Sequence, residues 1–118
     1  MKYLIQKRRT GKTTNLINLL IAEMAKHQNY TFLFYSINAC ALPDCIKKNP
    51  RIKVNPQNFR GYEQDKVCLF VDDANINGHF LMNMKNIFSA YPLLKEKSYI
   101  TLDEECYPND FMVAITES

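Results

Sequence analysis

Residues 1–14 of the chain read MKYLIQKRRTGKTT, in which a short apolar run is followed by basic residues and then by Gly11-Lys12-Thr13. These last three residues match the second half of the signature G-x-x-x-x-G-K-[ST], whose backbone N–H groups, lysine and hydroxyl surround the phosphates and the magnesium ion of a nucleotide. Gln6 stands where the signature has its first glycine, so the match is degenerate. The stretch predicts a buried strand, a phosphate-binding loop and a helix, in that order.

The segment after the loop has the apolar spacing of a helix. Apolar residues recur every three or four positions, which predicts a helix from about Lys12 to His27. Its expected buried face consists of Leu16, Ile17, Leu20, Ile21, Met24 and Ala25. The N-terminus of this helix would point at the phosphates, so the surroundings of the signature support it.

The rest of the chain alternates between strand-like and helix-like segments. Strands are predicted at residues 3–5, 30–36, 51–54, 67–71, 99–102 and 111–118. Besides the first helix, a short helix is expected after Pro43, and a longer one over residues 79–91 with Leu81, Met84, Ile87, Phe88 and Tyr91 on its inner face. This order predicts a three-layer α/β fold, with a mainly parallel central sheet of about four to five strands flanked by helices.

Composition limits the class of protein. With 118 residues, 47% of them hydrophobic, residues 1–118 are expected to form a single compact domain. The net charge of +3 favours anionic ligands only mildly, and is weaker than the basic surface of a dedicated DNA-binding domain. The longest apolar run, residues 67–71, is far shorter than a membrane span, and no signal peptide is recognisable. We therefore expect a cytoplasmic protein without a membrane partner.

The cysteines and histidines do not form a recognisable metal motif. The four cysteines are Cys40, Cys45, Cys68 and Cys106. They lack a C-x-x-C pair, so we expect them to be small buried hydrophobes rather than metal ligands or disulfides. His27 and His79 fall at the end of one predicted helix and beside the start of another, where a structural role is expected.

Residues 66–74 read KVCLFVDDA and form the second informative stretch. Five successive apolar residues suit a central parallel strand covered on both faces, and Asp72 and Asp73 would project into the crevice where such sheets bind ligands. This is the form of a Walker B element, in which Asp72 would hold the magnesium shell and Asp73 would activate water. A strand followed by an aspartate-rich turn is the alternative. The position about 55 residues after the loop favours Walker B.

Three elements together resemble a known family. They are the strand with Gly11-Lys12-Thr13, the strand with Asp72-Asp73, and an apolar strand that ends Ile115-Thr116-Glu117-Ser118. The order resembles the P-loop ATPases with an additional central strand, most closely the ATPase domain of viral DNA-packaging motors, the large terminase subunits. In that family an arginine three residues before the glycine moves to the γ-phosphate, and Arg8 stands at that position. Thr116 matches the polar end of the coupling motif that senses the γ-phosphate.

The resemblance implies a P-loop NTPase fold and a small packaging or translocation ATPase, in the host cytoplasm if viral. Its cofactors would be ATP or another nucleoside triphosphate and Mg²⁺. Thr13 and Asp72 would bind the metal, and Asp73, Arg8 and Thr116 would act in catalysis. The nucleotide-binding loop would consist of Lys7, Arg8, Arg9, Thr10, Gly11, Lys12, Thr13 and Thr14.

The chain also departs from this family. Family members carry a nuclease domain, whereas no nuclease carboxylate cluster is recognisable here, so we expect no DNA cleavage. Asp73 replaces the usual glutamate, and its shorter side chain affects hydrolysis more than nucleotide binding. The alternative is a nucleotide-binding regulatory or interaction module with little or no hydrolysis. A small nucleotide kinase ranks last, because an arginine-rich lid is not found.

The family resemblance also bears on partners. The family has the strand order 5-1-4-3-2, so loss of the fifth strand would leave the first strand at an edge with unpaired backbone groups. We therefore expect a homo-oligomer or a partner motor subunit, with DNA as a further partner. Because the first strand starts at residue 1, weak base selectivity is also expected.

Overall fold

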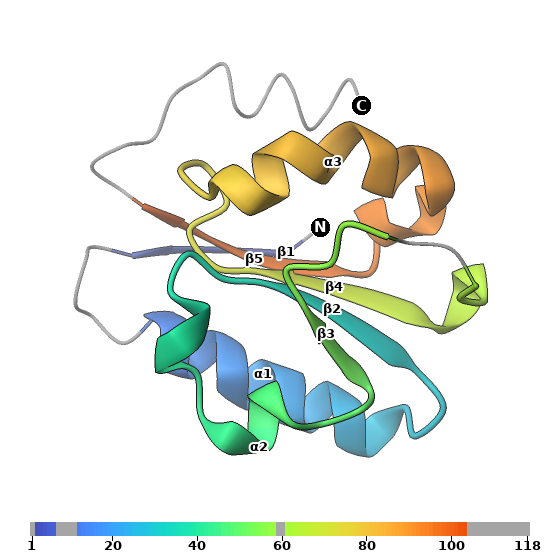
Figure 1. Ribbon diagram of the computed structural model, residues 1–118, viewed down its shortest axis with the longest axis horizontal. Coiled ribbons are helices and arrows are strands. Elements are labelled where there is room, and N and C mark those ends of the chain that lie inside the picture. Colours follow the sequence, from blue (N-terminus) through green and yellow to red (C-terminus); the bar gives the residue numbers. More distant parts are fainter. Residues whose placement is uncertain (1, 7–11, 59–60, 104–118) are drawn as a thin grey trace.

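The computed structural model describes residues 2–6, 12–58 and 61–103, which contain a five-stranded, entirely parallel sheet (Figure 1). The strands are β1 (Lys2–Gln6), β2 (Thr31–Tyr35), β3 (Ile52–Val54), β4 (Val67–Val71) and β5 (Ser98–Asp103). They lie side by side in the order β1-β5-β4-β2-β3. The predicted α/β fold with a parallel sheet is confirmed.

Helices cover both faces of the sheet. The α-helices are α1 (Lys12–Lys26), α2 (Asp44–Lys47) and α3 (Gly78–Ala90), and the 3-10 turns are η1 (Ala39–Ala41), η2 (Gln64–Lys66) and η3 (Pro92–Lys95). Helices α1 and α2 lie on one face and α3 lies on the other, which gives three layers (Figure 1). Each of these α-helices was predicted, with ends that differ by only one or two residues.

The core consists of two apolar clusters, one on each face. Because side chains alternate along a strand, Phe32 and Phe34 of β2 pack toward α1, whereas Leu33 and Tyr35 pack toward α3. Every residue of β4 is buried. The continuous apolar run of residues 67–71 is therefore the sequence pattern of a strand that is covered on both sides.

The residues that α1 and α3 bury differ in part from the predicted ones. In α1, Leu16 and Leu20 are fully buried, whereas Ile21 is 50% exposed and Ala25 is also exposed. In α3, Phe80 occupies the inner position, and Leu81 is 40% exposed. Apolar spacing locates a helix correctly but does not fix its rotation against the sheet to better than about one residue.

The sheet order determines which segments meet at its carboxyl end. Strand β5 lies between β1 and β4, with Ile100 opposite both Tyr3 and Val71. Among the described strands, β1 is paired only with β5 and is an edge strand, as expected. The predicted strand at residues 111–118 lies outside the described residues. Since all five strands are parallel, the N-terminus of α1 lies at the edge where β4 and β5 end.

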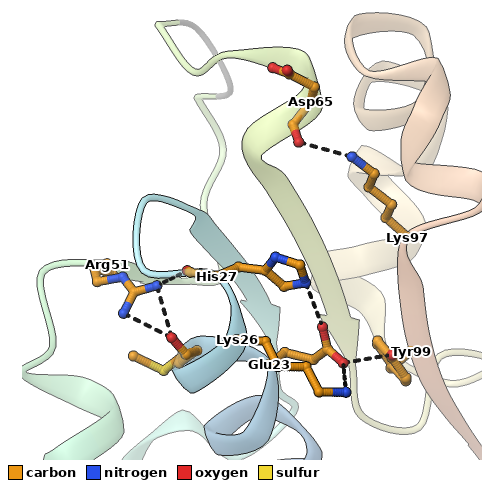
Figure 2. A network of polar contacts seen from close by, with 8 residues as sticks. Glu23, Lys26, His27, Arg51, Asp65, Lys97 and Tyr99 are labelled. Atoms are coloured by element: carbon orange, nitrogen blue, oxygen red, sulfur yellow. Dashed lines mark hydrogen bonds and ion pairs between the residues drawn. The ribbon is translucent and has the colours of Figure 1, made fainter.

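The amino end of the sheet carries a network of polar contacts (Figure 2). The guanidinium of Arg51 donates hydrogen bonds to the carbonyls of Met24, His27 and Tyr30, just where α1 ends and β2 begins. Glu23 accepts a hydrogen bond of 3.0 Å from the hydroxyl of Tyr99, forms an ion pair with Lys26, and has its Oε2 3.3 Å from Nε2 of His27. The guanidinium thus occupies the carbonyl end of the α1 dipole, where positive charge is stabilising.

The prediction for the cysteines was partly wrong. Cys68 is buried, but Cys40 and Cys45 are exposed, and Cys106 lies outside the described residues. In the segment that contains η1 and α2, Leu42 and Ile46 point into the core instead. The three described cysteines are free thiols.

None of the described helices has the length and apolar character needed to cross a membrane.

Candidate functional site

Two predicted metal ligands are in direct contact. Thr13 lies in the first turn of α1, and Asp72 directly follows β4. The Thr13 hydroxyl donates a hydrogen bond of 2.6 Å to Oδ2 of Asp72, across 59 residues of sequence. The fold thus brings together the helix that follows β1 and the carboxylate at the end of β4.

Thr101 of β5 completes the surroundings of this carboxylate. Its hydroxyl donates to Oδ1 of Asp72 at 2.8 Å and accepts from the backbone N–H of Asp73 at 2.7 Å. Thr101 is fully buried, between the buried residues Ile100 and Leu102. It was not among the predicted site residues. The sequence does show a hydroxyl within an apolar strand. That this hydroxyl contacts Asp72 follows only from the sheet order, which places β5 next to β4.

The partners that the structure describes for the Asp72 carboxylate are neutral. Each oxygen accepts a hydrogen bond from a threonine hydroxyl, and the residue is only 7% exposed. None of the ion pairs formed by the side chains that the structure describes involves Asp72, and the side chain of Lys12 is not among those described. Carboxylate oxygens are ligands that hard cations prefer, and a cation bound here would supply the opposite charge that a buried carboxylate needs.

The main chain around Asp72 is fixed from two sides. Its N–H donates to the carbonyl of Tyr35 at 2.9 Å, which extends the pairing of β4 with β2 by one residue. Its carbonyl accepts from the side-chain amide of Asn77 at 3.0 Å, and the Asn77 oxygen accepts from the N–H of Phe80 at 3.1 Å. Asn77 therefore caps α3 and ties the start of that helix to Asp72.

Asp73 makes the turn that leads the chain out of the sheet. Its φ of 51° lies in the left-handed region, which aspartate adopts more readily than most residues. The N–H of Ala74 then donates to the carbonyl of Thr101 at 2.8 Å, so β5 holds both sides of the turn. One carboxylate oxygen of Asp73, Oδ1, is buried.

The remaining predicted residues are only partly described. Lys12 is the first residue of α1, and Thr14 is exposed in the same turn. The other members of the predicted loop and the predicted coupling residue lie outside the described residues; they are Lys7, Arg8, Arg9, Thr10, Gly11 and Thr116. The described part of the candidate site therefore consists of Thr13, Asp72 and Asp73 from the prediction, together with Thr101.

The donor set fits magnesium better than a softer metal. A carboxylate and a hydroxyl are hard oxygen ligands, and Mg²⁺ is usually held by one or two carboxylates with phosphate oxygens and waters in the other positions. Groups of three or more histidine, cysteine, aspartate or glutamate side chains able to hold a metal are not found in the described part of the chain. The first turn of α1 adds N–H groups and the positive end of a 15-residue helix, which attract anions.

Comparisons of the chain with protein-family models, with curated proteins and with solved structures found no match.

Proposed function

We propose that the chain binds a nucleoside triphosphate, preferably ATP, together with Mg²⁺, and hydrolyses it. The observation that carries this proposal is the 2.6 Å contact between the hydroxyl of Thr13 and the carboxylate of Asp72. Both residues come from motifs that in sequence suggest magnesium and phosphate binding. The contact supports a single site for both motifs.

Each residue has a distinct role in this proposal. Lys12 and the N–H groups at the start of α1 would bind phosphate oxygens, and Thr13 and Asp72 would hold the metal. Thr101 fixes the orientation of the Asp72 carboxylate through Oδ1, and Oδ2, which accepts from Thr13, would be the oxygen that turns to the metal. Bound Mg²⁺ would supply charge neutralisation of the phosphates during transfer.

The strand order supports a narrower version of the proposal. One strand, β5, separates β1 from β4, as an additional central strand does in the ATPase class that the sequence resembles. Thr101 on that strand is placed where a polar side chain can respond to changes at Asp72. We therefore favour a P-loop ATPase of the packaging or translocation type, with DNA and further motor subunits as partners.

A nucleotide-binding module with little hydrolysis is the second candidate, and Asp73 favours it. The residue occupies a left-handed turn and has one buried carboxylate oxygen. A general base must come within about 2.6–3.2 Å of the water that it activates, or act through one further water. The aspartate side chain is shorter than that of glutamate and is partly buried, so its carboxylate reaches such a water less easily than a glutamate carboxylate does.

Binding is tested by titrating ATP into the protein with Mg²⁺ and again with a chelator. We expect Thr13→Val to weaken binding of Mg·ATP by at least about tenfold, because a metal ligand and a hydrogen bond are lost. Binding without Mg²⁺ should change much less. Thr31→Val, at the opposite end of the sheet, is the matched control and should bind normally. Equal affinities in all three proteins would reject the site.

Hydrolysis is tested by phosphate release with and without DNA. An ATPase of the translocation type should release phosphate in repeated turnovers, faster with DNA, and Asp73→Asn should lower the rate while leaving ATP affinity nearly intact. Asparagine also adopts the left-handed backbone, so the turn is preserved. Tight Mg·ATP binding without turnover would instead support the binding module.

A further inference from the structure

A cavity lies on the α3 side of the sheet, away from Asp72. It has a volume of about 590 Å³ and is formed between the loop that follows β3 and the last turns of α3. The polar and aromatic side chains that line it are those of Gln57, Asn58, Tyr62, Asn86 and Tyr91. Helix α3 starts beside Asp72 and ends at this cavity, a length of about 20 Å for 13 residues. The two sites are therefore separate.

The walls of the cavity combine flat rings with carboxamides. Tyr91 is 5% exposed, and Tyr62 is partly buried against the same apolar cluster. Their ring centroids are 6.5 Å apart with planes inclined by 35°. The carboxamide side chains of Gln57, Asn58 and Asn86 are exposed around them. The rings thus form an apolar floor, and the amides form a polar rim.

The described lining residues carry no formal charge. Among them there is no lysine or arginine to bind phosphate and no carboxylate to bind an amine. A carboxamide both donates and accepts hydrogen bonds, in the same spacing as the edge of a nucleobase. Phenol rings offer faces on which a planar heterocycle can stack. The size is also within the range of small-ligand sites.

We propose that this cavity binds an unpaired nucleobase, through stacking on the partly exposed ring of Tyr62 and hydrogen bonds to the carboxamides of the rim. The base can belong to a free nucleoside or nucleotide, or to a single-stranded nucleic acid. In the second case the phosphates of the strand would lie outside the neutral cavity. The inference does not rely on the magnesium site, because the groups that it uses are at the other end of α3.

Uncharged ribonucleosides are the first probe, because they lack phosphates and cannot use the phosphate site. They are titrated in the presence of a chelator, and the side-chain amide signals of the protein are followed by NMR. We expect saturable shifts of the Gln57, Asn58 and Asn86 amides at millimolar concentrations. Asn86→Ala should weaken binding at least about fivefold, as loss of one or two hydrogen bonds predicts. Asn18→Ala, an exposed asparagine on α1, is the matched control and should bind normally.

Three outcomes would overturn the proposal. The first is that no nucleoside saturates the protein at concentrations up to about 10 mM, which would mean very weak binding at best. The second is that ribose alone binds with equal strength. The third is that Asn86→Ala leaves the affinity unchanged. A short single-stranded oligonucleotide then distinguishes the sources. Tighter binding than the nucleoside, with the same loss in Asn86→Ala, would indicate a strand, and equal binding would indicate a free nucleoside. Thr13→Val should affect neither titration, which separates this proposal from the first.

Discussion

At the amino end of the sheet, charged groups meet opposite charges or the carbonyl end of a helix: Glu23 pairs with Lys26, and Arg51 donates to the carbonyls at the end of α1 (Figure 2). At the carboxyl end, the carboxylate of Asp72 meets two neutral hydroxyls, from Thr13 and Thr101. The first arrangement is complete within the described residues. In the second, no cationic partner is found among the described side chains, and a bound cation would supply one. Charge pairing thus distinguishes an end that holds the fold together from an end that is suited to a ligand.

The largest loss of stability should follow a change at the amino end. Arg51→Met removes the hydrogen bonds to three carbonyls around the end of α1 and the contact of the guanidinium with the Phe32 ring. We expect the free energy of unfolding to fall by about 2–4 kcal/mol in denaturant titrations, because these carbonyls lose a charged partner. Affinity for Mg·ATP should not change. A variant as stable as the natural chain would show that the network contributes little.

The next effect concerns the carboxyl end. Lys12→Ala should weaken ATP binding by at least about tenfold, since a charge-assisted contact to phosphate contributes on the order of 1.5–3 kcal/mol. Its free energy of unfolding without nucleotide should change little. Calorimetric titration measures the affinity, and Lys26→Ala, at the other end of α1, is the matched control. If both variants bind ATP equally well, the phosphate loop is assigned wrongly.

Much of the fold was predictable because it depends on local patterns. The apolar run of residues 67–71 identified a central strand, and helical spacing located α1 and α3. Thr13 and Asp72, which the structure places in contact, could be singled out because each follows a strand in a recognisable motif. These features require only the neighbouring residues.

Features that depend on the sheet order were not predictable in the same way. Thr101 contacts Asp72 because β5 lies beside β4, and Arg51 reaches α1 from the start of a strand 24 residues beyond His27. The error at Cys40 and Cys45 has a simpler origin. Cysteine was treated as a buried residue, whereas the spacing of Leu42 and Ile46 determines which side of that segment faces the core.

The free energy of unfolding should also depend on pH, because of a thiol near the amino end of the sheet. Burial, with a smaller contribution from the Glu23 carboxylate, raises the pKa of the Cys68 thiol from 9.0 to about 11. Above pH 9 the unfolded chain loses this proton while the folded chain keeps it, so the free energy of unfolding falls as pH rises from about 9 to 11, by about 1.4 kcal/mol per unit of pKa difference. Denaturant titrations of the natural chain and of Cys68→Ala should diverge over this range. Parallel curves would contradict the assignment.

The smallest effect should come from a single hydroxyl at the amino end. Tyr99→Phe removes the 3.0 Å hydrogen bond to Glu23 but keeps the ring that stacks on Phe70 with centroids 5.1 Å apart. We expect a loss of about 0.5–1.5 kcal/mol, typical of one hydrogen bond. Thermal unfolding measures the change, and Tyr30→Phe is a control on a neighbouring ring. A loss much larger than this would mean that Glu23 is held mainly by Tyr99 rather than by His27 and Lys26.

The most direct test of the difference between the two ends is the stability of Asp72→Asn with and without Mg·ATP. Asparagine can pair with both threonines, its oxygen accepting from Thr101 and its NH₂ group donating to the Thr13 oxygen, but it carries no charge. We expect the ligand-free variant to unfold within about 1 kcal/mol of the natural chain. Mg·ATP at one hundred times its dissociation constant should stabilise the natural chain by about 2.7 kcal/mol and the variant far less. Two results would contradict the assignment of Asp72 to a magnesium site. One is equal stabilisation of both proteins by Mg·ATP, and the other is a ligand-free variant whose free energy of unfolding falls as far as that of Arg51→Met.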